Sequence, residues 1–301
     1  SGKTRVITHK IAWLVDDYGV KPSQIAAITF TNKAAKEMKE RVGKLIGGRA
    51  EGLIVSTFHA LGVRILRQEA ASVGLKPGFS ILDAADTTAL FQELAGNIDK
   101  GRLRALQSRI SLWKNMLVDP EAALVDAADE IEAAAAKLYA DYERTLRAYQ
   151  AVDFDDLIRL PVKLFTEHEA VAQRWRSRIW HLLVDEYQDT NRGQYRLVQL
   201  LTQGRDSFTA VGDDDQSIYA WRGADSENLR LLKDDYPTLK VVKLEQNYRS
   251  TSRILHAANT LIANNPKLFE KKLWSEHGQG DAIHIQTCRD GDHEAEWVGS
   301  R

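Results

Sequence analysis

Two adjacent carboxylates stand directly at the end of an apolar run. Asp185 and Glu186 follow HLLV in the segment HLLVDEYQDTN. Phosphoryl transfer to water needs one group that holds Mg²⁺, usually through its water shell, and one that takes a proton from the attacking water. Asp185 and Glu186 fit these two roles in that order. The other interpretation is that both carboxylates cap the next helix.

The chain opens with the closing half of the phosphate-loop pattern GxxxxGK[ST]. Ser1, Gly2, Lys3 and Thr4 supply this half, and a helix is expected over residues 4–15. In a complete loop, backbone amides and the helix N-terminus face the phosphates. The lysine reaches the β- and γ-phosphates, and the threonine hydroxyl coordinates magnesium. The same four residues also occur by chance at junctions between loops and helices.

Two more polar side chains follow strand-like runs. Gln216 comes after FTAVG, where a neutral amide can sense a γ-phosphate without adding charge. Arg249, in LEQNYRS, offers a planar and always-charged group for the charge that develops on a transferred phosphoryl group. An ordinary surface salt bridge is the other reading of Arg249. The aspartates at 213–215 are more typical of a solvated turn than of a metal site.

The segment SIYAWRG places two aromatic rings two residues apart. An extended backbone would project Tyr219 and Trp221 to one side, with Arg222 beside them. Such rings stack on the bases of a single-stranded nucleic acid, each stack contributing about 1–3 kcal/mol without sequence preference. Aromatic core packing is the alternative.

A parallel sheet is needed to position these side chains. Apolar runs rich in branched residues predict buried strands at residues 25–30, 52–56, 180–184, 208–212 and 239–244. Helical patterns such as 34–45 and 194–201 lie between them, so the fold class is α/β. The span 84–175 lacks strand-like runs and predicts a helical insertion, with Pro120 and Pro161 as breakers. A further helix is expected over 251–264.

Length and composition set broad limits. The 301 residues suggest about two domains. A net charge of −1 predicts no partner, although residues 21–50 hold seven basic and two acidic side chains and residues 119–156 hold three and eleven. A basic stripe that meets phosphates and a pair of solvated helix faces both fit this pattern. A single cysteine, Cys288, and no apolar run of about 20 residues predict a soluble, cytoplasmic protein.

Seven segments occur in the order found in superfamily 1 DNA helicases, and the chain resembles the UvrD/Rep/PcrA family over nearly its whole length. These are SGKTR, ITFTNKAAKEMKERV, STFHALGVRIL, DFDDLI, LLVDEYQDTN, VGDDDQSIYAWRGA and LEQNYRS. DFDDLI, VDEYQDTN and IANNPKLFEKKLW are most similar to the Rep branch. The resemblance implies a first RecA-like P-loop domain at 1–82 and 170–247, a helical insertion at 83–169, and the start of a second RecA-like domain at 248–301.

The resemblance also implies roles for single residues. Lys3 and Thr4 would bind ATP, Arg5 would lie against the adenine opposite Tyr248, and Gln216 and Arg249 would contact the γ-phosphate. Several positions match those near the DNA strand; these are Phe30, Asn32, Thr57, His59, Phe154, Tyr219, Trp221 and Arg222. Taken alone, His59 is more typical of a structural histidine.

The function implied is an ATP- and Mg²⁺-dependent 3′-to-5′ helicase. Its partners would be single-stranded DNA and DNA forks, with replication or repair proteins as further candidates. The family's first phosphate-loop glycine would precede residue 1 and a second arginine motif would follow residue 301, so a fragment is expected. Two other functions stay open: a non-catalytic fragment that binds single-stranded DNA, and a P-loop ATPase acting on proteins or metabolites.

Two charged segments complete the expectations. The helix after Phe30 carries interleaved lysines, an arginine and glutamates, which predicts intrahelical ion pairs and partial contact with phosphates. Asp153, Asp155 and Asp156 resemble a metal site but lack histidines, so they are expected to cap a helix and face solvent.

Overall fold

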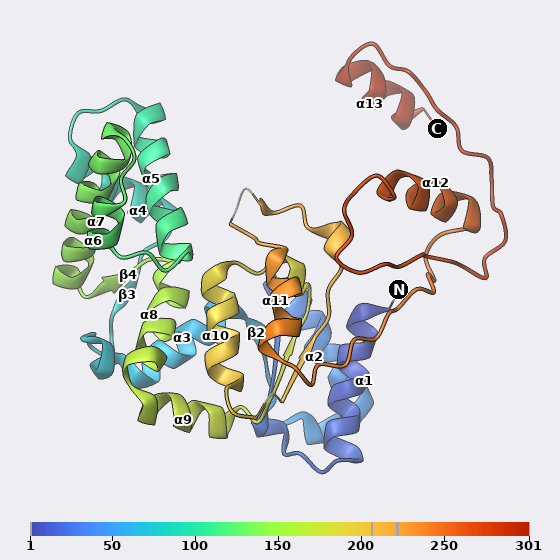
Figure 1. The fold of residues 1–301 in the computed structure, drawn as a ribbon, viewed down its shortest axis with the longest axis horizontal. Coiled ribbons are helices and arrows are strands. Elements are labelled where there is room, and N and C mark those ends of the chain that lie inside the picture. Colours follow the sequence, from blue (N-terminus) through green and yellow to red (C-terminus); the bar gives the residue numbers. More distant parts are fainter. Residues whose placement is uncertain (1, 206, 221–222, 301) are drawn as a thin grey trace. The chain divides into compact units, whose positions relative to one another are not determined.

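Four parallel strands form the centre of the larger unit of the chain (Figure 1). The computed structural model describes residues 2–205, 207–220 and 223–300, and these divide into two units, Lys3–Lys240 and the remainder. The strand order is β2-β1-β5-β6. The bounds are β1 Ile25–Thr29, β2 Ile54–Thr57, β5 His181–Val184 and β6 Phe208–Ala210. Four of the five predicted strands are therefore confirmed.

The fifth predicted strand, 239–244, is wrong. Within the described part of the chain this segment adopts no regular strand, and Val241 and Val242 are 45% and 68% exposed. Branched side chains favour a strand through packing against neighbouring strands rather than through an intrinsic backbone preference. An apolar run without such neighbours stays irregular.

Helices α1 (Lys3–Asp16) and α2 (Asn32–Ile46) cover one face of this sheet. Ile7, Ile11 and Leu14 of α1 lie at helical spacing and are buried against Ile25 and Ala27 of β1. Both faces of β1 are buried along its length, as in a parallel sheet with helices on both sides. The predicted α/β class is confirmed.

The remaining helices of this unit form two groups, one of which has its own hydrophobic core. Residues 84–149 form four helices with their own core, which includes Phe91, Ile110 and Tyr139. These four are α4 Ala84–Ala95, α5 Lys100–Asn115, α6 Pro120–Val125 and α7 Glu130–Tyr149. The others are α3 Phe58–Glu69, α8 Asp156–Glu167, α9 Glu169–Arg178, α10 Arg192–Thr202 and α11 Glu227–Asp235, with 3-10 turns at Pro22–Gln24, Gly47–Ala50, Ala70–Val73, Tyr187–Asp189 and Asp214–Gln216.

The helical character predicted for residues 84–175 is confirmed with two differences. A two-residue strand, β4 (Ala151–Val152), pairs in parallel with β3 (Ser80–Ile81). Pro120 starts α6, where a missing N–H costs nothing, but Pro161 lies inside α8 instead of breaking it.

Pro161 and Gly62 together bring α8 and α3 into backbone contact. Pro161 has no N–H, so it cannot make the usual helical bond to the carbonyl of Leu157. A Cβ built on Gly62 would lie 1.8 Å from that same carbonyl oxygen. Only glycine therefore fits this crossing, which fixes α3 against α8.

A buried ion cluster ties the insertion to the start of α8. The Lys114 ammonium, 1% exposed, lies 2.7 Å from Asp153, 3.0 Å from Asp156 and 3.0 Å from Glu143. Arg159 pairs with Asp156 and Glu143. Burial acts to lower the pKa of Lys114, but the carboxylates of Asp156, Asp153 and Glu143 hold it well above its ordinary value. Burial and then Asp156 raise the pKa of Asp153 to about 6.

This cluster corrects the expectation for the DFDD segment. Asp153 does accept a hydrogen bond from the Asp156 backbone N–H at 2.9 Å, as a cap would. Asp153 and Asp156 are nevertheless buried among cations and do not face solvent. The Asp155 carboxylate accepts a bond from the Asn115 amide at 2.9 Å. Arg159 lies only three residues after Asp156, but Lys114 lies 39 residues before Asp153, and local sequence spacing does not reveal that partner.

In the part of the second unit that the structure describes, the helices are α12 (Ser252–Ile262) and α13 (Gly291–Gly299). α12 confirms the helix expected over 251–264. Gln246 and Trp274 form an isolated parallel bridge, and the Asn247 N–H donates to the Trp274 carbonyl at 2.7 Å. Across the described parts of both units, no helix is both long and apolar enough to span a membrane.

Candidate functional site

The first helix begins where the phosphate-loop residues stand. α1 starts at Lys3, and Gly2 before it has φ +79°, a conformation that favours glycine. The free N–H groups of the first turn and the positive end of the helix dipole make this end of α1 suited to an anion.

Two hydrogen bonds join this end of α1 to the carboxylates after β5. The Lys3 ammonium donates to Glu186 Oε2 at 3.1 Å, and the Thr4 hydroxyl donates to Asp185 Oδ2 at 3.3 Å. The partners lie 183 and 181 positions apart in the sequence, yet the parallel sheet brings them to one edge. Lys3 and Thr4 therefore each contact one of the two carboxylates, as the phosphate-loop interpretation requires.

The two carboxylates have different environments. Asp185 is 5% exposed, and burial followed by the Glu186 charge raises the pKa of Asp185. Glu186 is half-buried and has φ +49°, a left-handed conformation that is rare outside glycine and concentrates at functional sites. Among the described residues, the cap of α10 is Asn191 and Glu186 makes no cap bond. The helix-capping interpretation is thus wrong.

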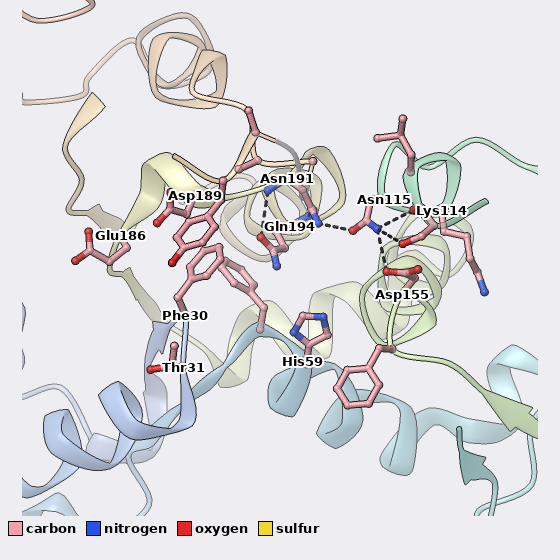
Figure 2. Close-up of a pocket in the computed structure, with 18 of the residues that line it drawn as sticks. Phe30, Thr31, His59, Lys114, Asn115, Asp155, Glu186, Asp189, Asn191 and Gln194 are labelled. Atoms are coloured by element: carbon pink, nitrogen blue, oxygen red, sulfur yellow. Dashed lines mark hydrogen bonds between the residues drawn. The ribbon is translucent and has the colours of Figure 1, made fainter. Parts of the chain in front are cut away.

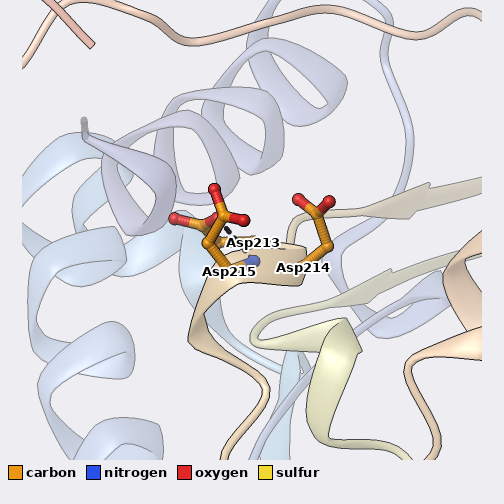
Figure 3. Close-up of side chains that lie close together, drawn as sticks. All are labelled: Asp213, Asp214 and Asp215. Atoms are coloured by element: carbon orange, nitrogen blue, oxygen red, sulfur yellow. Dashed lines mark hydrogen bonds between the residues drawn. The ribbon is translucent and has the colours of Figure 1, made fainter. Parts of the chain in front are cut away.

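Gln216 lies on the same edge, after β6. Its amide Nε2 donates to Asp213 at 2.6 Å, and its Oε1 is 3.5 Å from the Lys3 ammonium. Figure 3 shows Asp213, Asp214 and Asp215 together on this turn, with their carboxylates within 4.8 Å of one another. Asp213 also accepts from the Asp215 N–H at 3.3 Å. These bonds give Asp213 a turn-stabilising role, as expected for this segment.

The donor set fits magnesium and a phosphate chain. The Thr4 hydroxyl and the Asp185 carboxylate are hard oxygen ligands of the kind that Mg²⁺ prefers. A bound cation would also offset the cost of keeping Asp185 ionised while buried. Lys3 supplies the positive charge that a phosphate requires.

One groove connects this edge to the aromatic residues predicted to meet DNA. The groove has a volume of about 1820 Å³ and is lined by Thr4, Asp185 and Glu186 at the phosphate-loop edge. Its other lining residues include Phe30, His59, Phe154 and Tyr219; Figure 2 shows the first two with Asp155 and Asn191 around the hollow.

Each of these four side chains is at least partly exposed to solvent. Phe154 is 54% exposed and its ring lies 5.8 Å from that of His59. Burial lowers the pKa of His59, and Asp155 opposes the shift. Tyr219 is half-buried and so is not sealed in the core. Trp221 and Arg222 lie outside the described residues.

Two other predicted positions do not line the groove as the structure describes it. Asn32 is exposed at the first residue of α2. Thr57 is buried, and its hydroxyl accepts a bond from the Ala60 N–H at 3.2 Å as the cap of α3. In α2 the expected intrahelical ion pair is present between Arg41 and Glu37 at 3.5 Å.

Arg5 belongs to the larger unit, and Tyr248 and Arg249 belong to the second. Arg5 is exposed on α1 and its Nε donates to His9 at 3.4 Å. Tyr248 and Arg249 belong to the second unit, where both are exposed and the Tyr248 hydroxyl donates to Gln246 at 2.8 Å. Ser1 lies outside the described residues.

Sequence reasoning missed two polar residues that organise the groove. Gln188 is buried between Glu186 and the turn after β6. Asn115 bonds to Asp155 of the α8 segment and to Asn191, the cap of α10. Gln188 stands inside the VDEYQDTN segment that was already singled out, whereas Asn115 carries no sequence signal, since its partners lie 40 and 76 positions away.

Comparison with known proteins gives matches over nearly the whole chain. The model of the UvrD/REP helicase N-terminal domain matches residues 1–237, and that of the UvrD-like helicase C-terminal domain matches residues 242–301. ATP-dependent DNA helicase Rep is 53% identical in Escherichia coli K12 and 52% identical in Salmonella typhimurium, each over 99% of this chain and 45% of the relative. ATP-dependent DNA helicase PcrA of Staphylococcus aureus is 44% identical over 99% of this chain and 41% of the relative. The chain thus spans less than half the length of these relatives, and the expected likeness to the Rep branch is confirmed.

Proposed function

Because this chain belongs to the UvrD/REP helicase family, we propose that it carries the ATP-hydrolysing part of a DNA helicase. It would couple hydrolysis of Mg-ATP to 3′-to-5′ movement on single-stranded DNA and to unwinding of the duplex at forks. The observation that supports this most is the contact between Lys3 and Glu186 at 3.1 Å, in one groove with the aromatic side chains. The polarity rests on the family resemblance alone.

The residues at the sheet edge divide the work of hydrolysis. Lys3 binds the β- and γ-phosphates, and Thr4 and Asp185 hold the metal. Mg²⁺, when bound, neutralises charge on the phosphates. Glu186 takes the proton from the attacking water, for which its half-buried carboxylate is available. Gln216 contacts the γ-phosphate as a neutral amide.

The family resemblance suggests three further nucleotide contacts. We assign Arg249 to the γ-phosphate, and Tyr248 with Arg5 to the two faces of the adenine. In this scheme residues 1–82 and 170–247 are the first RecA-like domain, 83–169 are the insertion, and 248–301 begin the second RecA-like domain.

Single-stranded DNA would lie along the aromatic part of the groove. Bases would stack on exposed rings, and phosphates would meet polar and basic groups, so that binding falls with salt and ignores sequence. The stacking residues would be Phe30, His59, Phe154, Tyr219 and Trp221, and the backbone contacts would come from Asn32 and Arg222. Thr57 is buried as the cap of α3 and would act by fixing the start of that helix.

ATPase activity with and without single-stranded DNA tests this function. The wild-type protein should be stimulated by DNA, and Glu186→Gln should lose about 10²- to 10⁴-fold in kcat because the proton acceptor is gone. Trp221→Ala should weaken stimulation by DNA more than ATP binding. Full activity of Glu186→Gln, or no stimulation of the wild-type protein, would contradict the assignment.

Unwinding assays test the polarity. Duplexes with a 3′ single-stranded tail should be unwound and those with a 5′ tail should not. The opposite preference would reject 3′-to-5′ movement while leaving the ATPase assignment intact.

A second candidate function follows from the coverage of the relatives, which is at most 45%. The 301-residue chain by itself would bind single-stranded DNA without turning over ATP. Measured turnover by this chain would reject the second candidate, and retained DNA affinity without turnover would support it.

A further inference from the structure

Gln188 occupies a buried position between the two segments that follow β5 and β6. It lies in the 3-10 turn Tyr187–Asp189 and is 1% exposed. Its amide Nε2 donates to Glu186 Oε2 at 3.0 Å, and its Oε1 accepts from the Asp213 backbone N–H at 2.9 Å. One side chain therefore joins the carboxylate of Glu186 directly to the backbone of the neighbouring turn.

The turn after β6 is built closely around this amide. A Cβ on Gly212 would lie 3.1 Å from Gln188 Oε1, which is tighter than ordinary packing allows. At the other end of the turn, the Ser217 hydroxyl donates to the Gln188 carbonyl at 3.5 Å. Gln188 thus contacts both ends of residues 212–217, and Tyr219 follows two positions later.

The carboxylate of Glu186 has two donors of different kinds. Lys3 is a cation, and in the proposed function it binds phosphate. Gln188 is neutral, so it fixes the direction of the carboxylate without the strong opposition to proton uptake that a bound cation would add. A catalytic base is held in its productive orientation by hydrogen bonds from neighbouring side chains that are themselves fixed by packing.

We propose that Gln188 is a positioning residue that aims Glu186 at the attacking water and links this aim to the turn 212–217. The inference rests on the proposed ATPase function and deepens it. A shift of that turn, which leads to the DNA-facing Tyr219, would move the Asp213 N–H and with it the amide that holds Glu186. In this way Gln188 would transmit the effect of bound DNA from the turn to Glu186 and so stimulate hydrolysis.

Two nearly isosteric variants separate the two bonds. Gln188→Glu keeps an acceptor for the Asp213 N–H but loses the donor to Glu186. Gln188→Met keeps the length of the side chain and loses both bonds. In the full-length protein, both should lower kcat by about 10- to 100-fold, the range expected for a misaligned catalytic group, with KM for ATP within about twofold.

The ratio of DNA-stimulated to basal ATPase tests the link between the turn and Glu186. Because that link runs through both bonds of Gln188, Gln188→Glu and Gln188→Met should each bring this ratio toward one. Gln199→Met is a matched control, because Gln199 is a half-buried glutamine of α10 whose amide bonds to Asp235 instead. It should retain both kcat and the ratio.

Several outcomes overturn the inference. If Gln188→Glu keeps wild-type kcat, or if the variants lose affinity for a fluorescent ATP analogue as strongly as they lose kcat, Gln188 is only a packing residue. If Gln188→Met does not fold, Gln188→Glu still decides between these results. A wild-type protein that single-stranded DNA does not stimulate would instead contradict the proposed function.

Discussion

Replacing Lys114 with methionine should strongly destabilise the helical insertion. The cluster contains two cations and three carboxylates, so its formal charge is −1 and becomes −2 in Lys114→Met. Methionine has a similar length, so the loss is electrostatic rather than a cavity. Removing one partner of a buried pair costs about 3–5 kcal/mol, because the remaining charge stays buried. We expect a loss in this range.

Hydrogen exchange measures this loss locally. Amides of α5 and α7 should open with a free energy about 3–5 kcal/mol lower, while those of β1 should keep theirs. The double variant Lys114→Met/Asp153→Asn restores the formal charge of −1 and should recover part of the loss. Lys163→Met is the control, since Lys163 pairs with Glu167 at 3.8 Å on the surface and such pairs contribute about 0.5 kcal/mol. A loss below about 1 kcal/mol in Lys114→Met would refute the reasoning.

Three further predictions concern stability. Gly62→Ala should lower the free energy of unfolding by about 1–3 kcal/mol or more, because the new methyl group would lie 1.8 Å from a backbone carbonyl oxygen. The control Gly43→Ala adds a methyl group in open space and should be neutral or stabilising. Equal urea midpoints for the two variants would contradict this prediction. Burial, reinforced by the Lys10 charge, lowers the pKa of His181 from 6.5 to about 4. The neutral imidazole therefore stabilises the fold fully above pH 6.5, and the free energy of unfolding should fall by about 3 kcal/mol as the pH drops to 4. This fall should be absent in His181→Gln in pH-dependent urea titrations. Asn115→Ala should cost about 1–3 kcal/mol, because buried partners on α8 and α10 lose their bonds, and faster amide exchange in the first turn of α10 would report it.

The parts of the site that follow local rules could be predicted from the sequence. Neighbouring residues alone indicate a buried strand that ends in two acids. They also indicate a helix that starts with a lysine and a threonine. The family resemblance assigns Lys3 and the two acids to one nucleotide site, so Lys3 and Glu186 could be expected to lie together. The run 239–244 failed because its apolar character was not matched by a neighbouring strand.

The parts that depend on tertiary contacts could not be predicted. Asp153 and Asp156 looked solvated because their neighbours in sequence are acidic, and only the fold brings Lys114 between them. Gln188 lies within a recognisable segment, but its role depends on the Asp213 N–H, 25 positions away. Buried polar networks of this kind are specified by pairs that are far apart in the chain.

The crossing of Gly62 over the Leu157 carbonyl has a mechanical consequence. Helices separated by a layer of side chains can slide by changing rotamers, but two backbones in direct contact have no such layer to yield. His59 precedes Gly62 by three positions and Phe154 precedes Leu157 by three, and their rings lie 5.8 Å apart. We expect this backbone contact to hold that spacing constant when other walls of the groove move.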